Sequence, residues 1–490
     1  MGTTTNGVYR LDIDKKELTH PIKKGNITSF YRDSEGELWI GSWEEGLFHV
    51  KTDGKIENFR YDAKNPHSLS SNFVRACCED NLGNIWIGTF NGLNRYNKST
   101  GLFQNHTAND IQTDGLTHSS IWCIVKDNQG TLWLGTYFGG VNYFNPEYEI
   151  YTRYSYSSNE KKGLSNPVVG RTIEDKNGNL WIGTEGGGLN YYNRRTREFK
   201  WYRPQEGRNS ISHNNVKALY YDADKEIIWI GTHLGGLNKL DIRSGHFTHY
   251  RMEGNNPQSL PSDIIRDITP YKDLLIIATQ NGVCLFNPAN GQCRQLFKDS
   301  KEGKSIKMVA DVVFDSEGTL WIAATGEGVF SYRFDTRKLT NYRHDAANPN
   351  SLSNNNVNNI TQDSKGNLWF STSGSGLDLY RPETNDFENF DKGKNGLASD
   401  CIYETQESPT SGKLLLITNE GFSIFDYRNK DFNNYSAENG FPLTAVNENA
   451  LCVTRDGEIF LGGVQGMISF HEMELNFTPK PYKLSLIHIS

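Results

Sequence analysis

Short runs of alternating apolar and polar residues, separated by Gly, Asn and Asp, recur along the whole chain. One period, Ser70–Thr107, contains four such runs: NFVRACCED, IWIGTF, LNRYN and LFQNHT. Runs of β-branched and aromatic residues between turn residues are typical of antiparallel hairpins. Each period is therefore expected to form one sheet of four antiparallel strands.

The clearest form of the repeated phrase is GNLWIGTEGGGL, which begins at Gly178, and weaker versions bring the number of copies to eleven. The first five tryptophans of these phrases lie 47, 47, 48 and 48 residues apart, and the seven copies with a tryptophan centre on Trp39, Trp86, Trp133, Trp181, Trp229, Trp321 and Trp369. A period of this length with four strands indicates a β-propeller. Because a propeller usually has at most about eight blades, eleven copies predict an all-β fold of tandem β-propellers with four-stranded antiparallel blades.

Counting seven blades back from the last copy places the domain boundary near Pro146. We expect residues 1–145 to form a partial first propeller of about four blades and residues 146–477 to form a complete second propeller. Residues 478–490 would be a tail, either the truncated start of a following domain or a remnant of cloning. Since the first copy, Thr3–Val8, is only the second half of a repeat, we interpret the chain as a fragment. The lack of a signal peptide then carries no information about its compartment.

The last repeat provides three strands, and Pro479 and Pro481 disfavour a fourth strand after them. The segment Tyr148–Tyr156 carries the Tyr-x-x-Tyr pattern of other outer strands. It would either supply the missing strand and close the second ring, or complete the blade before it. We favour closure, because a closed ring leaves no sheet edge unpaired.

The conserved-looking features of the phrase have structural explanations. A buried indole removes about 150–250 Å² from water, so the tryptophans are interpreted as wedges between blades. The turn DKNGN (Asp175–Asn179) predicts an Asx hydrogen bond and lacks the distal Glu of a calcium loop. The small thiols of Cys77, Cys78 and Cys123 are interpreted as core residues. Cys284 and Cys293 flank a hairpin turn and are either free or bridged.

Composition narrows the range of functions. A net charge of −7 without a basic block argues against nucleic acid contact, and no apolar run approaches the roughly 20 residues that span a bilayer. The acidic residues fall mostly in turns, and no Ser/His/Asp arrangement or phosphate-binding loop is present. His213 and His233 lack a partner at metal-ligand spacing. We therefore predict no catalytic residues, no cofactor and no metal.

The phrases GNLWIGTEGGGLNYYN and GTYFGGVNYFNPEYEIYTRY, with the linker NPxSLSxNxV (Asn65–Val74, Asn348–Val357), resemble two-component regulator propeller repeats. The resemblance covers almost the whole chain. It implies the non-catalytic periplasmic sensor region of a Bacteroidetes hybrid two-component system, which recognises glycan-derived oligosaccharides and controls carbohydrate-utilisation genes. It further implies a homodimer in the full-length protein, and contact with the membrane and a histidine kinase only through downstream segments.

Sugar binding requires aromatic platforms beside hydrogen-bonding side chains. In a four-stranded blade the loop after Gly-Thr and the start of the innermost strand open on the same face. The inner-strand positions aligned with Arg75 include Trp122, Lys217 and Arg266. The predicted ligand-binding residues are Trp43, Phe90, Trp122, Tyr137, Phe138, Glu185, His233 and Gln280. A protein-interaction scaffold and a propeller glycoside hydrolase or lyase stay as alternatives.

Overall fold

The computed structural model describes residues 1–65, 67–98, 101–108, 116–146, 151–436, 441–443 and 445–475. The chain divides into two compact units, Met1–Glu149 (unit 1) and Ile150–Ser490 (unit 2). The predicted all-β fold is confirmed: among the described residues, helical structure is confined to α1 (Lys392–Asn395) and short 3₁₀ turns at Glu160–Lys162, Gly303–Ser305 and Glu472–Glu474. The predicted tail, 478–490, lies outside the described residues.

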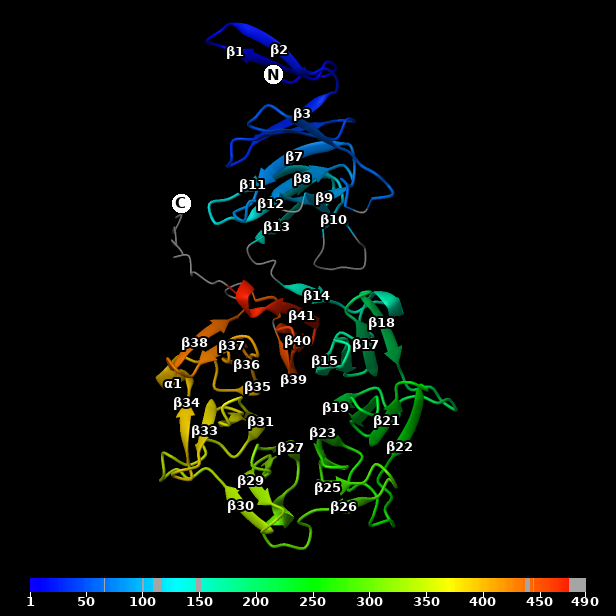
Figure 1. Ribbon diagram of the computed structural model, residues 1–490, viewed down its shortest axis with the longest axis vertical. Helices are drawn as coiled ribbons and strands as arrows, with labels where there is room; N and C mark the ends of the chain where they lie inside the picture. The colour runs from blue at the N-terminus through cyan, green and yellow to red at the C-terminus, as the bar shows by residue number, and fades with distance from the viewer. Residues whose placement is uncertain are drawn as a thin grey trace, which may run out of the picture. The chain divides into compact units, whose positions relative to one another are not determined.

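Unit 1 contains four sheets within its described residues (Figure 1). The period 70–107 forms the antiparallel sheet β7–β10, as predicted. The sheets of unit 1 are β1 (Val8–Asp12) and β2 (Glu17–Ile22); β3 (Ile27–Arg32), β4 (Leu38–Ser42), β5 (Leu47–Val50) and β6 (Ile56–Phe59); β7 (Val74–Glu79), β8 (Ile85–Thr89), β9 (Gly92–Asn97) and β10 (Leu102–His106); and β11 (Ile121–Lys126), β12 (Leu132–Thr136) and β13 (Val141–Phe144).

Unit 2 is a ring of seven four-stranded sheets, with the innermost strands β15, β19, β23, β27, β31, β35 and β39 each next to the following one (Figure 1). The first six sheets are β15 (Val169–Glu174), β16 (Leu180–Thr184), β17 (Leu189–Asn193) and β18 (Glu198–Tyr202); β19 (Val216–Asp222), β20 (Ile227–Thr232), β21 (Leu237–Asp241) and β22 (His246–Tyr250); β23 (Ile265–Tyr271), β24 (Leu274–Thr279), β25 (Gly282–Phe286) and β26 (Cys293–Gln295); β27 (Val309–Phe314), β28 (Leu320–Ala324), β29 (Gly328–Arg333) and β30 (Lys338–Tyr342); β31 (Val357–Gln362), β32 (Leu368–Thr372), β33 (Leu377–Arg381) and β34 (Asp386–Phe390); and β35 (Ile402–Glu407), β36 (Leu414–Thr418), β37 (Gly421–Asp426) and β38 (Asp431–Tyr435).

The seventh sheet joins the two ends of unit 2. It consists of β39 (Val446–Val453), β40 (Glu458–Gly463) and β41 (Gly466–His471), and its outer strand is β14 (Thr152–Tyr154). β14 runs antiparallel to β41, with Thr152 opposite Ser469 and Tyr154 opposite Met467. The predicted closure of the ring is confirmed, because residues 152–154 pair with β41. Residues 148–150 of the predicted segment lie outside the described residues.

The tryptophans of the repeated phrase are buried between neighbouring sheets, as predicted, except Trp133, which is 43% exposed. Trp229 on β20 packs in one cluster with Ile265, Ile277 and Phe286 of the next sheet. The turn aspartate has a second role that the sequence did not show. In the fifth sheet of the ring, Asp363 Oδ1 accepts backbone N–H bonds from Lys365 (3.0 Å) and Asn367 (2.9 Å), while Oδ2 accepts the Nε1–H of Trp369 (3.0 Å). One side chain therefore closes the turn and satisfies the polar atom of the buried indole.

The cysteines divide differently from the prediction. Cys77 and Cys78 are buried as predicted, but Cys123 is exposed. Cys123 lies opposite Gly135 on the innermost strand β11, at the position of Ala76 in β7, and does not face a neighbouring sheet. Cys284 and Cys293 are buried free thiols in one cluster.

A buried asparagine ties the third strand of several sheets to the linker before the sheet. Asn94 Oδ1 accepts the backbone N–H of Ser70 (2.7 Å) and Asn94 Nδ2 donates to Ser70 Oγ (2.9 Å). On β33 the equivalent residue is Asp378, which accepts from the N–H (2.9 Å) and Oγ (2.8 Å) of Ser353. Burial raises the pKa of Asp378 to about 6, because desolvation disfavours the charged carboxylate.

Asp378→Asn is expected to stabilise unit 2 at neutral pH. The folded-state pKa of Asp378 lies above its ordinary value. The stability that the neutral form contributes is therefore fully present below about pH 4 and is lost as the pH rises through about 6. We expect the variant to raise the free energy of unfolding by about 1–3 kcal/mol at pH 7.5 and to match the parent at pH 3.5. Urea unfolding at both pH values measures this. The buried Asn94, which lies opposite Asn105, shows that an amide fits at this position. If the variant and the parent differed in free energy of unfolding by the same amount at both pH values, the explanation would be contradicted.

Around the ring's channel, each innermost strand is joined to the next one by side-chain hydrogen bonds rather than by backbone pairing. Asp311 Oδ2 accepts the N–H of Ile360 (2.7 Å), Asn359 Oδ1 accepts that of Thr405 (2.9 Å), and Glu404 Oε2 accepts that of Leu451 (2.9 Å). Each bond satisfies a buried donor on the next sheet. Burial and the neighbouring Asp267 raise the pKa of Asp311. These carboxylates therefore serve as structural acceptors.

Candidate functional site

One backbone hydrogen bond fixes the loop residue that follows the repeated Gly-Thr. The N–H of this residue donates to a carbonyl just before the innermost strand of its own sheet, in Trp43 to Asn26 (2.8 Å), Phe90 to Phe73 (2.9 Å), Tyr137 to Ser120 (3.0 Å), Glu185 to Val168 (2.9 Å), His233 to Asn215 (3.0 Å) and Gln280 to Ile264 (3.1 Å). The side chain that varies is therefore held beside the start of an innermost strand. This is why loop and inner-strand positions meet on one face.

In unit 1 this arrangement gathers the predicted aromatic residues around Arg75. The guanidinium carbon of Arg75 lies 3.7 Å from the ring centroid of Trp122, 4.7 Å from that of Trp43 and 6.0 Å from that of Phe90. Arg75 thus stands between indoles from the sheets on either side. We name Arg75 and these rings, together with Phe73, Tyr137 and Phe138, the Arg75 cluster.

The remaining rings of the Arg75 cluster extend this surface. Tyr137 stacks on Trp122 with centroids 5.4 Å apart, and Phe138 lies edge-on to Tyr137 at 4.2 Å. Phe73, which was not among the predicted ligand residues, links Trp43 (5.3 Å) and Phe90 (6.2 Å). Phe73 precedes Val74 in the linker, and its position in the repeat did not distinguish it from a core residue.

The Arg75 cluster combines exposed ring faces with an unpaired cation. Trp122 is 46% exposed and Phe138 is 80% exposed; both belong to the last described sheet of unit 1, in which Trp133 of the repeated phrase is also 43% exposed. The buried Nε of Arg75 has no hydrogen-bond partner among the described residues, and burial lowers the pKa of Arg75. An aromatic platform with a fixed donor at its centre suits a ring-shaped, hydroxyl-bearing ligand.

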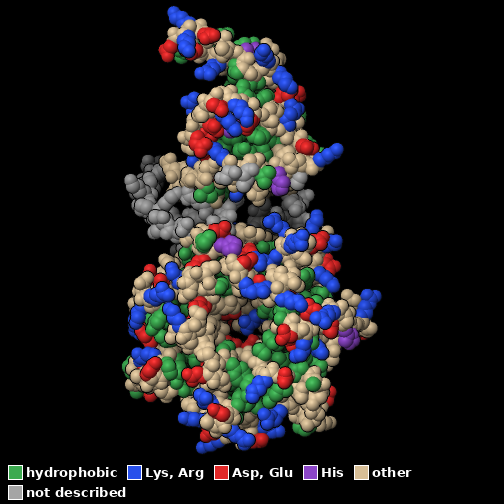
Figure 2. Space-filling view, in the orientation of Figure 1, with side chains coloured by type: hydrophobic (Ala, Val, Ile, Leu, Met, Phe, Trp, Pro, Cys, Tyr) green, Lys and Arg blue, Asp and Glu red, His purple; other side chains and the backbone are tan. Residues whose placement is uncertain are grey.

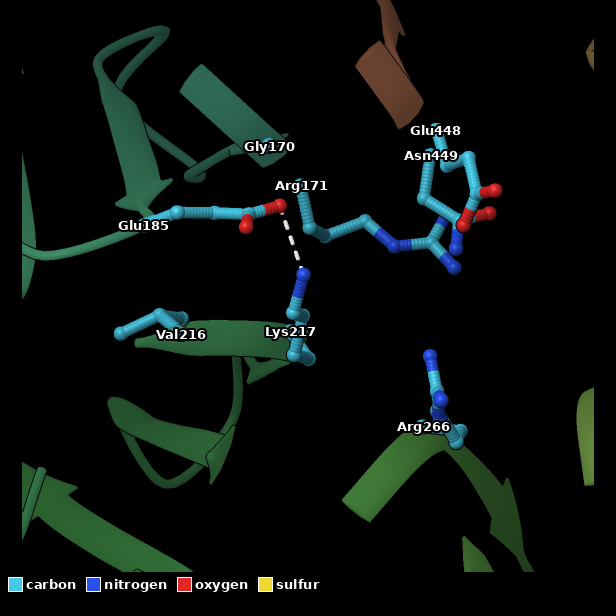
Figure 3. A pocket seen from close by; sticks show the side chains of 8 residues that line it. All are labelled: Gly170, Arg171, Glu185, Val216, Lys217, Arg266, Glu448 and Asn449. Atoms are coloured by element: carbon cyan, nitrogen blue, oxygen red, sulfur yellow. Dashed lines mark hydrogen bonds and ion pairs between the residues drawn. The ribbon is translucent and has the colours of Figure 1, made fainter. Parts of the chain in front are cut away.

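In unit 2 the same positions are polar and face a hollow at the mouth of the ring's channel. The hollow encloses a volume of about 20 Å³ and is lined by Gly170, Arg171, Glu185, Val216, Lys217, Arg266, Glu448 and Asn449 (Figure 3). Figure 2 shows basic and acidic side chains around the hollowed centre of this ring. Three basic side chains, those of Arg171, Lys217 and Arg266, point toward the middle of the hollow (Figure 3).

Glu185 has two bonding partners in the hollow. Its Oε1 lies 2.6 Å from Lys217 Nζ and accepts a hydrogen bond from Asn447 Nδ2 (3.1 Å). Burial opposes ionisation, but these two partners hold the pKa of Glu185 below its usual range. Glu185 is therefore a carboxylate that already has its partners.

The other two residues predicted in unit 2 have different positions. His233 lies beside the hollow, where burial and the charges of Arg266 and Lys217 lower its pKa; its buried Nδ1 has no partner among the described residues. Gln280 is exposed and does not line the hollow. The structure thus brings Glu185 and His233 together and leaves Gln280 apart.

The sequence pattern did not identify three of the lining residues: Arg171, Glu448 and Asn449. Glu448 and Asn449 belong to a bulge in β39, where the six residues from Val446 to Leu451 oppose only the three from Leu461 to Gly463. The signal was present in the sequence: Val446 and Gly462 are 16 positions apart, against 14 for Val169 and Gly183. The sequence alone does not show that this extra length places Glu448 and Asn449 at the hollow.

One described group of acidic residues has the spacing of metal ligands: Asp33, Glu35 and Glu37 in unit 1. Lys98 Nζ lies 3.0 Å from Asp33 and 3.3 Å from Glu35, and His49 Nε2 lies 2.6 Å from Glu37. Since basic side chains already face all three carboxylates, we assign no metal to this group.

Comparison with known proteins identifies the repeats. The family described as two component regulator propeller matches residues 21–44, 68–91, 115–138, 163–186 and 351–374. Among curated proteins, none matches the sequence. No helix among the described residues is long and apolar enough to cross a membrane.

Several solved structures have the same fold. The chain is similar, with 24% identity and a TM-score of 0.65, to the extracellular domain of the putative hybrid two component system BT3049 from B. thetaiotaomicron, covering all of this chain and 70% of that one. It is also similar to the corresponding domain of BT4673 from that organism (19%, TM-score 0.53, covering 96% and 69%). A further similar structure is PorZ, a surface component of the type-IX secretion system of Porphyromonas gingivalis (10%, TM-score 0.50, covering 96% and 72%).

Proposed function

We propose that the chain is the non-catalytic, periplasmic ligand-sensing region of a hybrid two-component signalling protein, because five of its segments match the family described as two component regulator propeller. Its ligand is an oligosaccharide derived from glycan breakdown, and its output is control of carbohydrate-utilisation genes. The similarity to extracellular domains of two B. thetaiotaomicron systems supports the sensing role and the location outside the cytoplasm.

The Arg75 cluster is the observation that carries the oligosaccharide proposal. Exposed aromatic side chains are costly on a protein surface, and a contiguous group of them marks a binding surface. Five of the six aromatic residues in the cluster come from loop or inner-strand positions that differ from sheet to sheet. The structural repeat does not require these rings, so their presence is explained by a ligand.

Signalling by such a region requires unequal affinity. A ligand that binds two arrangements of the protein equally tightly shifts neither population. We propose that occupancy favours one arrangement of two protomers in the full-length protein. The buried carboxylates of the channel are engaged in hydrogen bonds between strands, which agrees with a role in binding rather than in catalysis.

Trp122→Ala is expected to weaken oligosaccharide binding about tenfold to a hundredfold, because it removes one face of the Arg75 sandwich. Calorimetric titration of the chain with a panel of glycan oligosaccharides measures this. Trp201→Ala is the matched control, since Trp201 is an indole on β18 of unit 2, outside the Arg75 cluster.

The alternatives predict different results in the same experiment. Absence of binding to every glycan, together with capture of a specific protein partner, would favour a protein-interaction scaffold. Turnover of any oligosaccharide would favour a glycoside hydrolase or lyase. Equal binding by the parent chain and Trp122→Ala would remove the Arg75 cluster from the proposed site.

A further inference from the structure

Arg266 is a cation without a partner at the mouth of the channel in unit 2. It follows Ile265 on β23, just as Lys217 follows Val216 on β19. In both cases the loop of the preceding sheet reaches the innermost strand: Glu185 bridges to Asn215, and His233 bridges to Ile264. The two basic residues therefore have equivalent neighbours, one sheet apart.

The neighbours differ in charge, and this decides which cation is paired. Beside Lys217 the loop residue is Glu185, and the ion pair forms at 2.6 Å. Beside Arg266 the loop residue is His233, which offers no negative charge to pair with a cation; burial and the charges of Arg266 and Lys217 lower its pKa and favour the neutral imidazole. Among the described residues, Arg266 has neither a hydrogen bond nor an ion pair.

The other charges around the hollow do not neutralise Arg266. Arg171 is held by Glu404 and Asp267, each at 3.3 Å. Glu185 is occupied by Lys217 and Asn447. Glu448 is exposed on the bulge of β39, and its carboxylate makes no hydrogen bond among the described residues. The hollow therefore has one basic group free to bind an anion and an exposed carboxylate at its edge.

We infer that the hollow at the mouth of the channel binds an anionic group, with Arg266 of β23 as its principal ligand and Lys217 of β19 beside it. A guanidinium offers a planar fork of N–H donors that matches a carboxylate or a sulfate with two parallel hydrogen bonds. The enclosed space is only about 20 Å³, which is room for a group about the size of one water molecule. It therefore takes the charged group of an acidic or sulfated sugar, while the sugar ring stays outside the hollow. This site is separate from the Arg75 cluster and does not depend on it.

The test is calorimetric titration of the whole chain with four probes: a uronic acid disaccharide, a sulfated disaccharide, inorganic sulfate and neutral cellobiose. We expect at least one acidic disaccharide to bind and cellobiose not to bind at this site. Arg266→Gln should weaken that binding about tenfold to a hundredfold, since a charged hydrogen bond is lost. Glu448→Gln should strengthen it severalfold, because a repelling charge at the edge is removed.

Arg428→Gln is the control for loss of one positive charge, because Arg428 is exposed in the turn between β37 and β38 of the same unit. Arg266 makes no intramolecular bond, so its replacement should leave the thermal unfolding of unit 2 unchanged. The relative affinity for the uronate and the sulfated probe identifies the acidic group. The inference is overturned if Arg266→Gln binds the acidic probes as the parent does, if cellobiose competes equally, or if no anionic probe binds. Such results leave the Arg75 cluster to be judged by Trp122→Ala.

Discussion

Trp229→Ala is expected to lower the free energy of unfolding of unit 2 by about 3–5 kcal/mol. The indole of Trp229 is only 1% exposed and packs against Ile265, Ile277 and Phe286. Its removal leaves a cavity between two sheets, and the rigid strands on both sides restrict collapse around it. Urea unfolding combined with hydrogen exchange of peptides from β20 and β24 assigns the change to unit 2.

Trp133→Ala provides the matched control within the same repeated phrase. Trp133 is 43% exposed; it stacks on Tyr143 with centroids 5.2 Å apart and donates to Asp127 (2.8 Å). We expect a cost of about 1 kcal/mol in unit 1, mostly from the lost hydrogen bond. Equal costs for both variants would show that burial between sheets is not the source of the stability.

Tyr154→Ala is expected to lower the free energy of unfolding of unit 2 by about 2–4 kcal/mol. Tyr154 belongs to β14, which supplies the outer strand of the last sheet. Its ring packs against Tyr192 of the first sheet (5.2 Å) and Phe460 of the last sheet (5.9 Å). The loss should therefore weaken the junction between these sheets first, and hydrogen exchange of β15 and β41 should rise before that of β27.

Tyr156→Ala is the control for this prediction. Tyr156 lies two residues further along the chain, is 51% exposed and is outside β14. We expect it to change the free energy of unfolding by no more than about 0.5 kcal/mol. A similar loss in both tyrosine variants, or uniform exchange around the ring, would contradict a local role for Tyr154 in closing the ring.

Most of the fold could be predicted because its signals are local. Strand runs, turn aspartates and the Trp of each phrase are repeated with nearly constant spacing, and each copy carries the same hydrophobic pattern. Even the closure by β14 was readable, since its tyrosines match those of other outer strands. Cys123 was placed in the core wrongly. At the equivalent positions Ala76 and Ala218 pack in clusters with the next sheet, whereas no described sheet of unit 1 follows β11–β13, and the local pattern cannot show this.

The candidate residues were less predictable. Trp43, Phe90 and Trp122 were chosen because they vary where the repeat is constant, and the structure brings them together around Arg75. Gln280 satisfied the same rule but lies apart from the hollow. Variation between copies of the repeat identifies the face of the ring on which these residues lie. It does not identify which side chains on that face contact one another.

The sequence by itself determined the class of fold, the copies of the blade and the face on which variable residues lie, since these follow from local pattern and period. The tertiary structure alone decided which charges are paired. Lys217 and Arg266 are alike in sequence context, but one meets Glu185 and the other meets His233. The partner comes from the loop of the preceding sheet, so the packing of adjacent sheets pairs Lys217 and leaves Arg266 without a partner among the described residues. The same long-range placement puts Arg75 between two indoles.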